Sequence, residues 1–159
     1  MENKYFNSKQ FYPTPKPLLD KILTKIRWEM VHTILEPSAG TGNIVDYIKT
    51  DTAYNYYRDN SMDIDCIELC EEFRSILKGK GYRVIHDNFL TFQTFKKYDL
   101  IVMNPPFNEG AAHLLKAIEL QRNGGSIICI LNAETLKNPF SNERKMLMQK
   151  LQDLGADIE

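Results

Sequence analysis

The chain has 159 residues, a length that fits one domain with a substantial core. Its composition, with 43% hydrophobic and 26% charged residues, is that of an ordinary soluble globular protein. The formal net charge of −1 gives no support to a nucleic-acid partner and does not argue against a small ligand. No apolar run is long enough to span a bilayer and no signal-peptide pattern follows Met1, so we expect a cytoplasmic protein without a membrane partner.

The N-terminal segment is polar as far as Gln10, and we expect it to be loosely structured. Residues 11–17 contain three prolines and cannot form a helix or a central strand. A helix should follow, because apolar residues from Leu18 to Ile26 recur on one face. Tyr12 and Thr14 lie in the proline-rich segment, which on the simplest interpretation only caps this helix.

The first strand is expected over Val31–Leu35, followed by the sequence Glu-Pro-Ser-Ala-Gly-Thr-Gly and a helix that begins near Asn43. Two glycines among small neighbours let a ligand approach the backbone, where the first N–H groups of the helix face it. A dinucleotide fingerprint would have a third glycine where Val45 stands, and the chain has no phosphate-binding P-loop. The alternative is that this turn is only a tight connection.

A tyrosine-containing insertion over 50–61 should precede a second strand, Met62–Leu69. Glu68, at its end, is positioned to accept hydrogen bonds from both hydroxyls of a ribose; alternatively it caps the helix expected over 71–78. A third strand is expected over Tyr82–His86. The polar residues that follow it can read the edge of an adenine or simply form an Asx turn.

The fourth strand, Tyr98–Met103, is an apolar run that Asn104-Pro105-Pro106-Phe107 stops abruptly. A helix is expected over 109–122, ended by Asn-Gly-Gly, and then a fifth strand over 126–131. The pattern further predicts a loop over 135–142, a helix over 143–154 and the start of a strand at 156–159. Three cysteines in apolar surroundings are predicted to be reduced, and three scattered histidines predict no metal site.

Alternation of strands and helices predicts an α/β fold with a mostly parallel sheet and helices on both faces, as one domain over 1–159. Right-handed crossovers place the ends of the first four strands along one edge. The four loops with ligand-binding chemistry, at 36–42, 68, 87–89 and 104–107, all fall on that edge. Their agreement is stronger evidence for a binding site than any one of them.

Five segments together resemble the amino-directed DNA methyltransferases that use S-adenosylmethionine, in the order typical of the adenine-N6 type from phages or mobile elements. The segments are Phe-Tyr-Pro-Thr-Pro at 11–15, residues 36–42, Glu68, Asn-Phe-Leu at 88–90 and Asn-Pro-Pro-Phe at 104–107. The resemblance implies a Rossmann-like class I methyltransferase sheet that lacks its last strand or strands, and thus a truncated or minimal catalytic core. It also implies a DNA partner, a flipped target base, a target-recognition region or subunit outside this core, and a role in restriction–modification.

The resemblance assigns two sets of site residues. The residues implied to contact the cofactor are Tyr12, Thr14, Glu36, Pro37, Ser38, Ala39, Gly40, Gly42, Ile67, Glu68, Leu69, Asp87, Asn88, Phe89 and Asn104. The catalytic set is Asn104, Pro105 and Phe107. The family has Asp where Asn88 stands, although an Asn carbonyl can still accept from an adenine amino group.

The implied chemistry begins with an aromatic amino nitrogen, whose lone pair is delocalised into the ring. Acceptance of its hydrogens by the Asn104 side-chain oxygen and the Pro105 carbonyl would turn that lone pair toward the methyl donor. Phe107 would stack on a base that has left the duplex. Methylation of RNA or of a protein glutamine by the same chemistry, or a cofactor-binding partner subunit without activity, remain alternatives.

Overall fold

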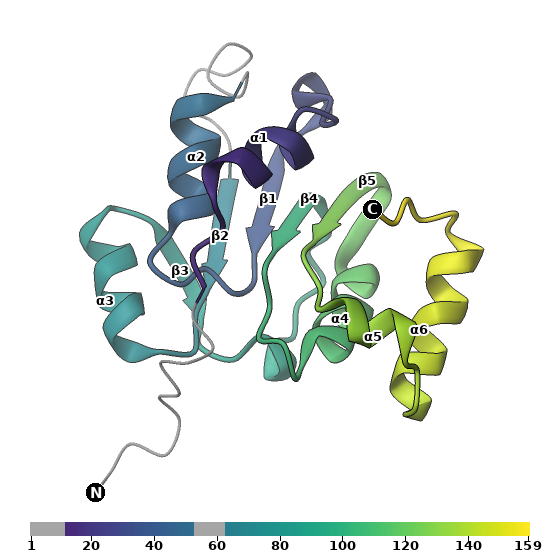
Figure 1. The fold of residues 1–159 in the computed structure, drawn as a ribbon. Coiled ribbons are helices and arrows are strands. Elements are labelled where there is room, and N and C mark those ends of the chain that lie inside the picture. The colour runs from purple at the N-terminus through teal and green to yellow at the C-terminus, as the bar shows by residue number, and fades with distance from the viewer. Residues whose placement is uncertain (1–11, 53–62) are drawn as a thin grey trace, which may run out of the picture.

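The computed structural model describes residues 12–52 and 63–159, so the expectations for residues 1–11 and for all but the first three residues of the tyrosine-containing insertion lie outside the described residues. It contains a five-stranded parallel sheet of order β3-β2-β1-β4-β5, which confirms the predicted fold class (Figure 1). The strands are β1 Thr33–Glu36, β2 Asp63–Ile67, β3 Arg83–His86, β4 Tyr98–Met103 and β5 Gln121–Cys129.

Strand β4 is buried at every residue because it lies inside the sheet and is covered on both faces. Alternate side chains of a strand point to opposite faces. Leu100 and Val102 therefore enter one hydrophobic cluster, while Ile101 and Met103 enter another. The apolar run predicted from the sequence has the same bounds as this strand.

The helices form a layer on each face of the sheet. Helices α1 (Lys16–Leu23) and α2 (Asn43–Asp51) pack on one face, and α3 (Glu71–Gly79) joins α2 there through Leu77 and Val45. Helices α4 (Gly110–Leu120) and α6 (Asn142–Asp153) cover the opposite face. Two short 3₁₀ helices, η2 (Trp28–Met30) and η4 (Phe89–Thr91), lie between these elements. No helix in the described ranges has the length and apolar character that a membrane span needs.

The boundary between α4 and β5 differs from the expectation. The helix ends at Leu120 and β5 begins at Gln121, so the glycine pair predicted to stop the helix lies inside the strand. A Cβ on Gly125 would lie 2.8 Å from the Asp99 carbonyl oxygen and 3.0 Å from that of Tyr98. A glycine is needed there because the backbones approach closely where the β4–β5 register shifts.

Two further predictions near the C-terminal end were wrong. The segment 135–142 was expected to be a loop, but α5 occupies Ala133–Lys137, and the side chain of Asn132 caps it by accepting a hydrogen bond from the Glu134 N–H at 3.0 Å. Residues 156–159 were expected to begin a strand, but the structure assigns them none. They run in irregular backbone, and Glu159 pairs with Lys21 and Lys25 of the α1 region.

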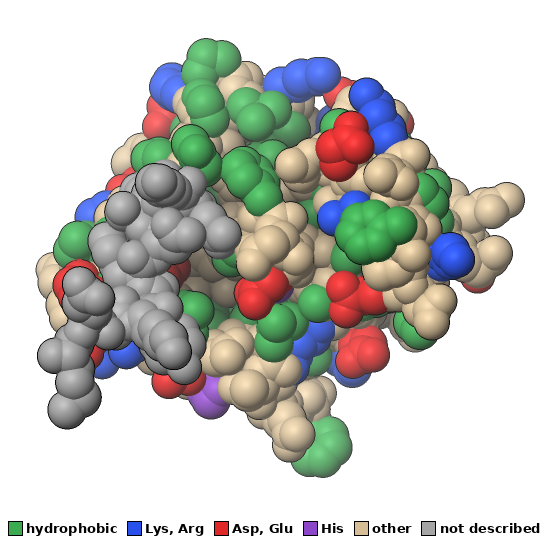
Figure 2. Space-filling view, turned by 60° about the horizontal axis from the view of Figure 1, so that its bottom comes forward, with side chains coloured by type: hydrophobic (Ala, Val, Ile, Leu, Met, Phe, Trp, Pro, Cys, Tyr) green, Lys and Arg blue, Asp and Glu red, His purple; other side chains and the backbone are tan. Residues whose placement is uncertain are grey.

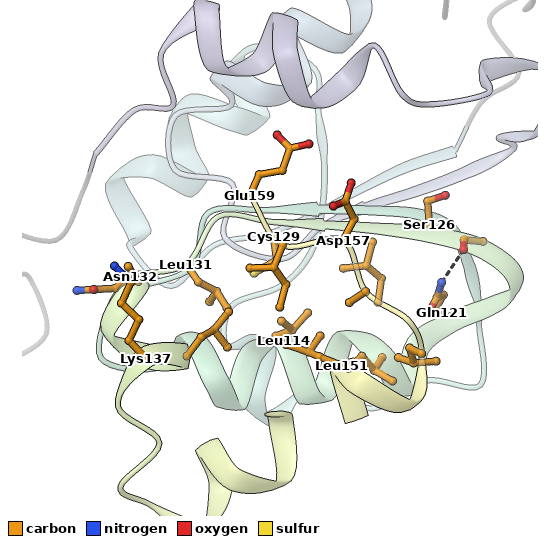
Figure 3. Close-up of a pocket in the computed structure, with 18 residues that line it drawn as sticks. Leu114, Gln121, Ser126, Cys129, Leu131, Asn132, Lys137, Leu151, Asp157 and Glu159 are labelled. Carbon is orange, nitrogen blue, oxygen red and sulfur yellow. Dashed lines mark hydrogen bonds between the residues drawn. The ribbon is translucent and has the colours of Figure 1, made fainter. Parts of the chain in front are cut away.

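A cavity of about 700 Å³ lies between β5, α4 and α6. Cys129 lines it from the strand side, Leu114 and Leu151 line it from the helices, and residues 156–159 also line it (Figure 3). The burial of the Cys129 thiol raises its pKa, which fits the expected small buried hydrophobe.

The strand order determines where a ligand can bind. The chain builds β1, β2 and β3 outward in one direction and then returns to place β4 on the other side of β1. In open α/β sheets, ligands bind beyond the carboxyl ends of the strands where the order reverses. The loops after β1 and β4 flank that point, as the sequence predicted.

Candidate functional site

The turn between β1 and α2 depends on its two glycines. Gly40 and Gly42 have φ values of 54° and 89°, the left-handed region that favours glycine. A Cβ on Gly42 would lie 2.8 Å from Leu77 Cδ2, so the turn also packs closely on α3. The Ala39 N–H donates to the Ile67 carbonyl at 3.0 Å, which fastens the turn to the end of β2.

Glu68 links this turn to the end of β2. Its Oε2 accepts a hydrogen bond from the Gly40 N–H at 2.6 Å, and its Oε1 accepts one from the Cys70 N–H at 2.8 Å. Burial raises the pKa of the Glu68 carboxyl, while these backbone N–H groups oppose the shift. The alternative prediction, that Glu68 caps α3, is thus partly correct, because Glu68 accepts from Cys70, the residue just before that helix. The same carboxylate also binds the glycine turn.

Glu36 is the most buried carboxyl of the site, with 1% of its surface exposed. Burial first, and then the charges of Glu68 and Asp46, hold the pKa of Glu36 well above its usual range, although the Val45 N–H opposes this. Within residues 12–52 and 63–159, Glu36 Oε2 and Ser38 Oγ are buried without a hydrogen-bond partner. Buried polar atoms are normally satisfied, so two orphans beside one turn fit a site that a polar ligand completes.

The residues after β3 form the Asx turn that was the alternative to an adenine contact. Asn88 Oδ1 accepts from the Leu90 N–H at 3.0 Å, and Asp87 Oδ1 accepts from the Asn88 N–H at 2.7 Å. Phe89 is only 2% exposed and packs beneath the turn in the core. A carbonyl oxygen has two lone pairs, so Asn88 retains capacity for a second donor.

Helix α4 supports this turn from below. Lys116 Nζ donates to the Leu90 carbonyl at 3.0 Å and lies 5.5 Å from the Phe89 ring centroid. The His113 ring is 5.5 Å from the same ring. Burial lowers the pKa of both His113 and Lys116. Sequence reasoning did not single out Lys116, because a lysine in an amphipathic helix usually faces water.

The loop after β4 is fastened to the N-terminal segment. Asn104 Nδ2 donates to the Tyr12 carbonyl at 3.1 Å and to Thr14 Oγ1 at 3.2 Å. The rings of Tyr12 and Phe107 are stacked, with centroids 5.4 Å apart and planes at 28°. Thr14 is 4% exposed, so its hydroxyl is an internal group and does not cap α1.

Asn43, the first residue of α2, connects the two halves of the site. Its Nδ2 donates to the Thr14 carbonyl at 2.8 Å, and it directly follows the glycine turn. The sequence analysis used Asn43 only as a helix start; the available signal was an amide side chain immediately after the glycines. Hydrogen bonds thus connect Gly40 with Glu68, and Asn104 with Tyr12 and Thr14. The Leu69 N–H also bonds to the Glu68 carboxyl, whereas exposed Asp87 has no hydrogen bond to either group among the described residues.

Comparison with known proteins agrees with this geometry. The family model of the methyltransferase small domain matches residues 10–151. The type II methyltransferase M.CvrRI of Paramecium bursaria Chlorella virus XZ-6E is 31% identical over 96 residues, which are 59% of this chain and 23% of that protein. The chain therefore spans less than a quarter of the curated relative in that match.

Solved structures show the same fold. Precorrin 8W decarboxylase from Methanobacterium thermoautotrophicum superposes with a TM-score of 0.60 at 17% identity, over 96% of this chain and 78% of that one. An S-adenosylmethionine-dependent methyltransferase from Clostridium acetobutylicum gives 0.53 at 17% identity, over 78% and 53%. Because the family model matches residues 10–151, well over half of its length, the chain belongs to the methyltransferase small domain family.

Proposed function

We propose that this chain is the catalytic domain of an enzyme that transfers a methyl group from S-adenosylmethionine to the exocyclic amino nitrogen of adenine in DNA. The observation that carries the proposal is Asn104-Pro105-Pro106-Phe107 at the carboxyl end of β4, beside the strand that leads to the glycine turn. The viral type II methyltransferase, 31% identical over 96 residues, supports it.

S-adenosylmethionine is the cofactor of this family, and when bound it supplies a methyl group carried on a positively charged sulfur. The residues fit such a ligand, because Glu68 retains lone pairs for ribose hydroxyls and Glu36 has an unpartnered buried oxygen. The turn over 36–42 and the N-terminal segment with Tyr12 and Thr14 would hold the methionine end. Asn88, with Ile67 and Leu69, would line the adenine.

Asn104 and Pro105 supply the acceptors that the target nitrogen needs. In the structure the Asn104 nitrogen is already engaged by Tyr12 and Thr14, which leaves its oxygen for a substrate hydrogen. The Pro105 carbonyl would accept the second hydrogen. No charged base is needed before attack, because the two acceptors make the nitrogen lone pair available by position and electrostatics alone.

The target base would have to leave the duplex to reach Asn104, since its amino group is otherwise inside the stack. Phe107 is 40% exposed and offers a ring on which the base can stack. On the face formed by the carboxyl ends of the strands, acidic, basic and hydrophobic side chains are interspersed (Figure 2). Because the described side chains on this face form no broad basic surface, strong duplex binding would require a recognition region or subunit besides them.

The test is transfer of a labelled methyl group to DNA, RNA or protein by the full-length protein, with mass spectrometry of the digested product. We expect N6-methyladenine from DNA, and loss of transfer in Asn104→Ala with cofactor affinity nearly unchanged. Label in RNA or in a glutamine side chain would replace the proposed substrate. Cofactor binding without transfer to any polymer would instead indicate a partner subunit.

A further inference from the structure

The side-chain amide of Asn104 has one defined orientation in this structure. Its nitrogen lies 3.1 Å from the Tyr12 carbonyl oxygen and 3.2 Å from Thr14 Oγ1. A backbone carbonyl can only accept a hydrogen bond, so the amide nitrogen and not the amide oxygen must face Tyr12. The contact with Tyr12 therefore determines which way the amide is turned.

The orientation decides what Asn104 offers on its other side. An Asn amide has two N–H hydrogens, and here each has its own acceptor. The oxygen, which can only accept, is left for a partner elsewhere. If the amide turned by 180°, its oxygen would face the Tyr12 carbonyl, and its donor nitrogen would face the hydrogens of an amino group.

The two acceptors belong to a segment that is itself held in place. The Asn43 side chain donates to the Thr14 carbonyl at 2.8 Å, and Thr14 is almost completely buried. Pro13 and Pro15 flank Thr14 and restrict its backbone. The Tyr12 ring stacks on Phe107, which is three residues beyond Asn104. The segment 12–15 is thus a fixed support between the start of α2 and the loop after β4.

We propose that the Thr14 hydroxyl and the Tyr12 carbonyl are positioning groups that hold the Asn104 amide with its oxygen toward the nitrogen to be methylated. The direction of the oxygen toward substrate rests on the proposed function, whereas the orientation itself rests only on the contacts above. Thr14 then has a role besides the cofactor contact that the family resemblance implies, since its oxygen acts on the catalytic amide.

The orientation can be tested without any methylation assay. In protein labelled with ¹⁵N-asparagine, the side-chain signals of Asn104 are those that disappear in Asn104→Ala. We expect both Asn104 hydrogens to exchange with water at least tenfold more slowly than those of exposed Asn142. Equal exchange rates in the unmodified protein would overturn the proposal, whatever happens to the variants.

Two variants at position 14 then separate the hydroxyl from the bulk of the side chain. Thr14→Val keeps the shape but removes the acceptor, so one Asn104 hydrogen should exchange at least tenfold faster and its signal should shift. Thr14→Ser retains the oxygen and should keep the slow exchange. Thr24→Val is a matched control, because Thr24 is exposed and bonds only within the α1 region. Unmoved Asn104 signals in a folded Thr14→Val protein would refute the role of Thr14.

Activity gives a second reading that distinguishes the two proposals. On the methyl acceptor that the transfer assay identifies, Thr14→Val should lower kcat at least tenfold at saturating cofactor, and Thr14→Ser should retain most of the wild-type kcat. If Asn104 is protected as expected but DNA is not methylated, the proposed substrate is wrong and the orientation stands. If DNA is methylated while Thr14→Val leaves both kcat and the Asn104 signals unchanged, the positioning role is wrong and the proposed function stands.

Discussion

Replacement of Glu68 by Ala tests whether this carboxylate both shapes the site and binds the cofactor. In the free protein, the change removes the acceptors for the Gly40 and Cys70 N–H groups, at 2.6 and 2.8 Å. In the complex it also removes the acceptors proposed for the ribose hydroxyls. The two effects appear in different measurements, namely protein stability and ligand affinity.

The magnitudes follow from the contacts. A hydrogen bond to a charged group contributes roughly 1.5–3 kcal/mol, so loss of the ribose contact should weaken cofactor binding about 10- to 150-fold. The free energy of unfolding should fall by about 1–3 kcal/mol. This is less than the contribution of two such bonds, because removing a half-buried carboxylate also removes the cost of its desolvation. The same desolvation raises the pKa of the Glu68 carboxyl.

Calorimetric titration with S-adenosylhomocysteine measures the affinity, and urea denaturation measures the stability. A 2′-deoxyribose analogue of the ligand isolates the ribose contact: it should bind more weakly than the parent to the unmodified protein but equally well to Glu68→Ala. Glu71→Ala is the matched control, since Glu71 is exposed in the first turn of α3. If Glu68→Ala binds S-adenosylhomocysteine within twofold of the wild-type affinity, the contact between Glu68 and the ribose is refuted.

Three other substitutions test the surrounding structure. Because burial raises the pKa of Glu36, the protonated carboxyl contributes its full stability below the ordinary pKa of 4.5, and this contribution is lost as pH rises through the folded-state pKa. Glu36→Gln should therefore raise the Tm of the ligand-free protein at pH 8 but not at pH 4. An equal change in Tm at both pH values would contradict a raised pKa at Glu36. Gly42→Ala places a Cβ 2.8 Å from Leu77 in a left-handed conformation, so urea denaturation should show a loss of at least roughly 1–2 kcal/mol, and an unchanged midpoint would exclude this strain. Lys116→Met removes the donor to the Leu90 carbonyl and should cost about 1 kcal/mol with faster amide exchange in η4, whereas unaltered exchange there would show that α4 does not hold the turn.

Much of the fold could be predicted because its strongest signals are local. Tyr98–Met103 is almost entirely apolar, as expected for a strand buried on both faces, two prolines follow it closely, and its predicted limits were correct. Gly124 and Gly125 misled the prediction, because a glycine can stop a helix or permit close contact between strands. The packing of Gly125 on the Tyr98 and Asp99 carbonyls is a long-range contact that no local pattern contains.

The site was predictable at the level of its loops but not of its connections. The types and spacing of Gly40, Glu68 and Asn104 indicated binding chemistry at one edge of a sheet. The hydrogen bonds from Asn43 and Asn104 to the segment around Thr14 span 29 and 90 residues. Such contacts depend on how the loops fold over one another, so they emerge only from the three-dimensional structure. Ala133–Lys137 was missed for a local reason, since Asn132 followed by Ala and Glu is a recognisable helix start.

The hydrogen bond between Gly40 and Glu68 has a thermodynamic consequence for ligand entry. This part of the site is assembled before any ligand arrives, because the turn, the end of β2 and the start of α3 already share one carboxylate. Coupled folding and binding gives a large negative heat-capacity change, since ordering a loop covers additional apolar surface. Here that change on ligand association should correspond only to the surface that the ligand itself covers.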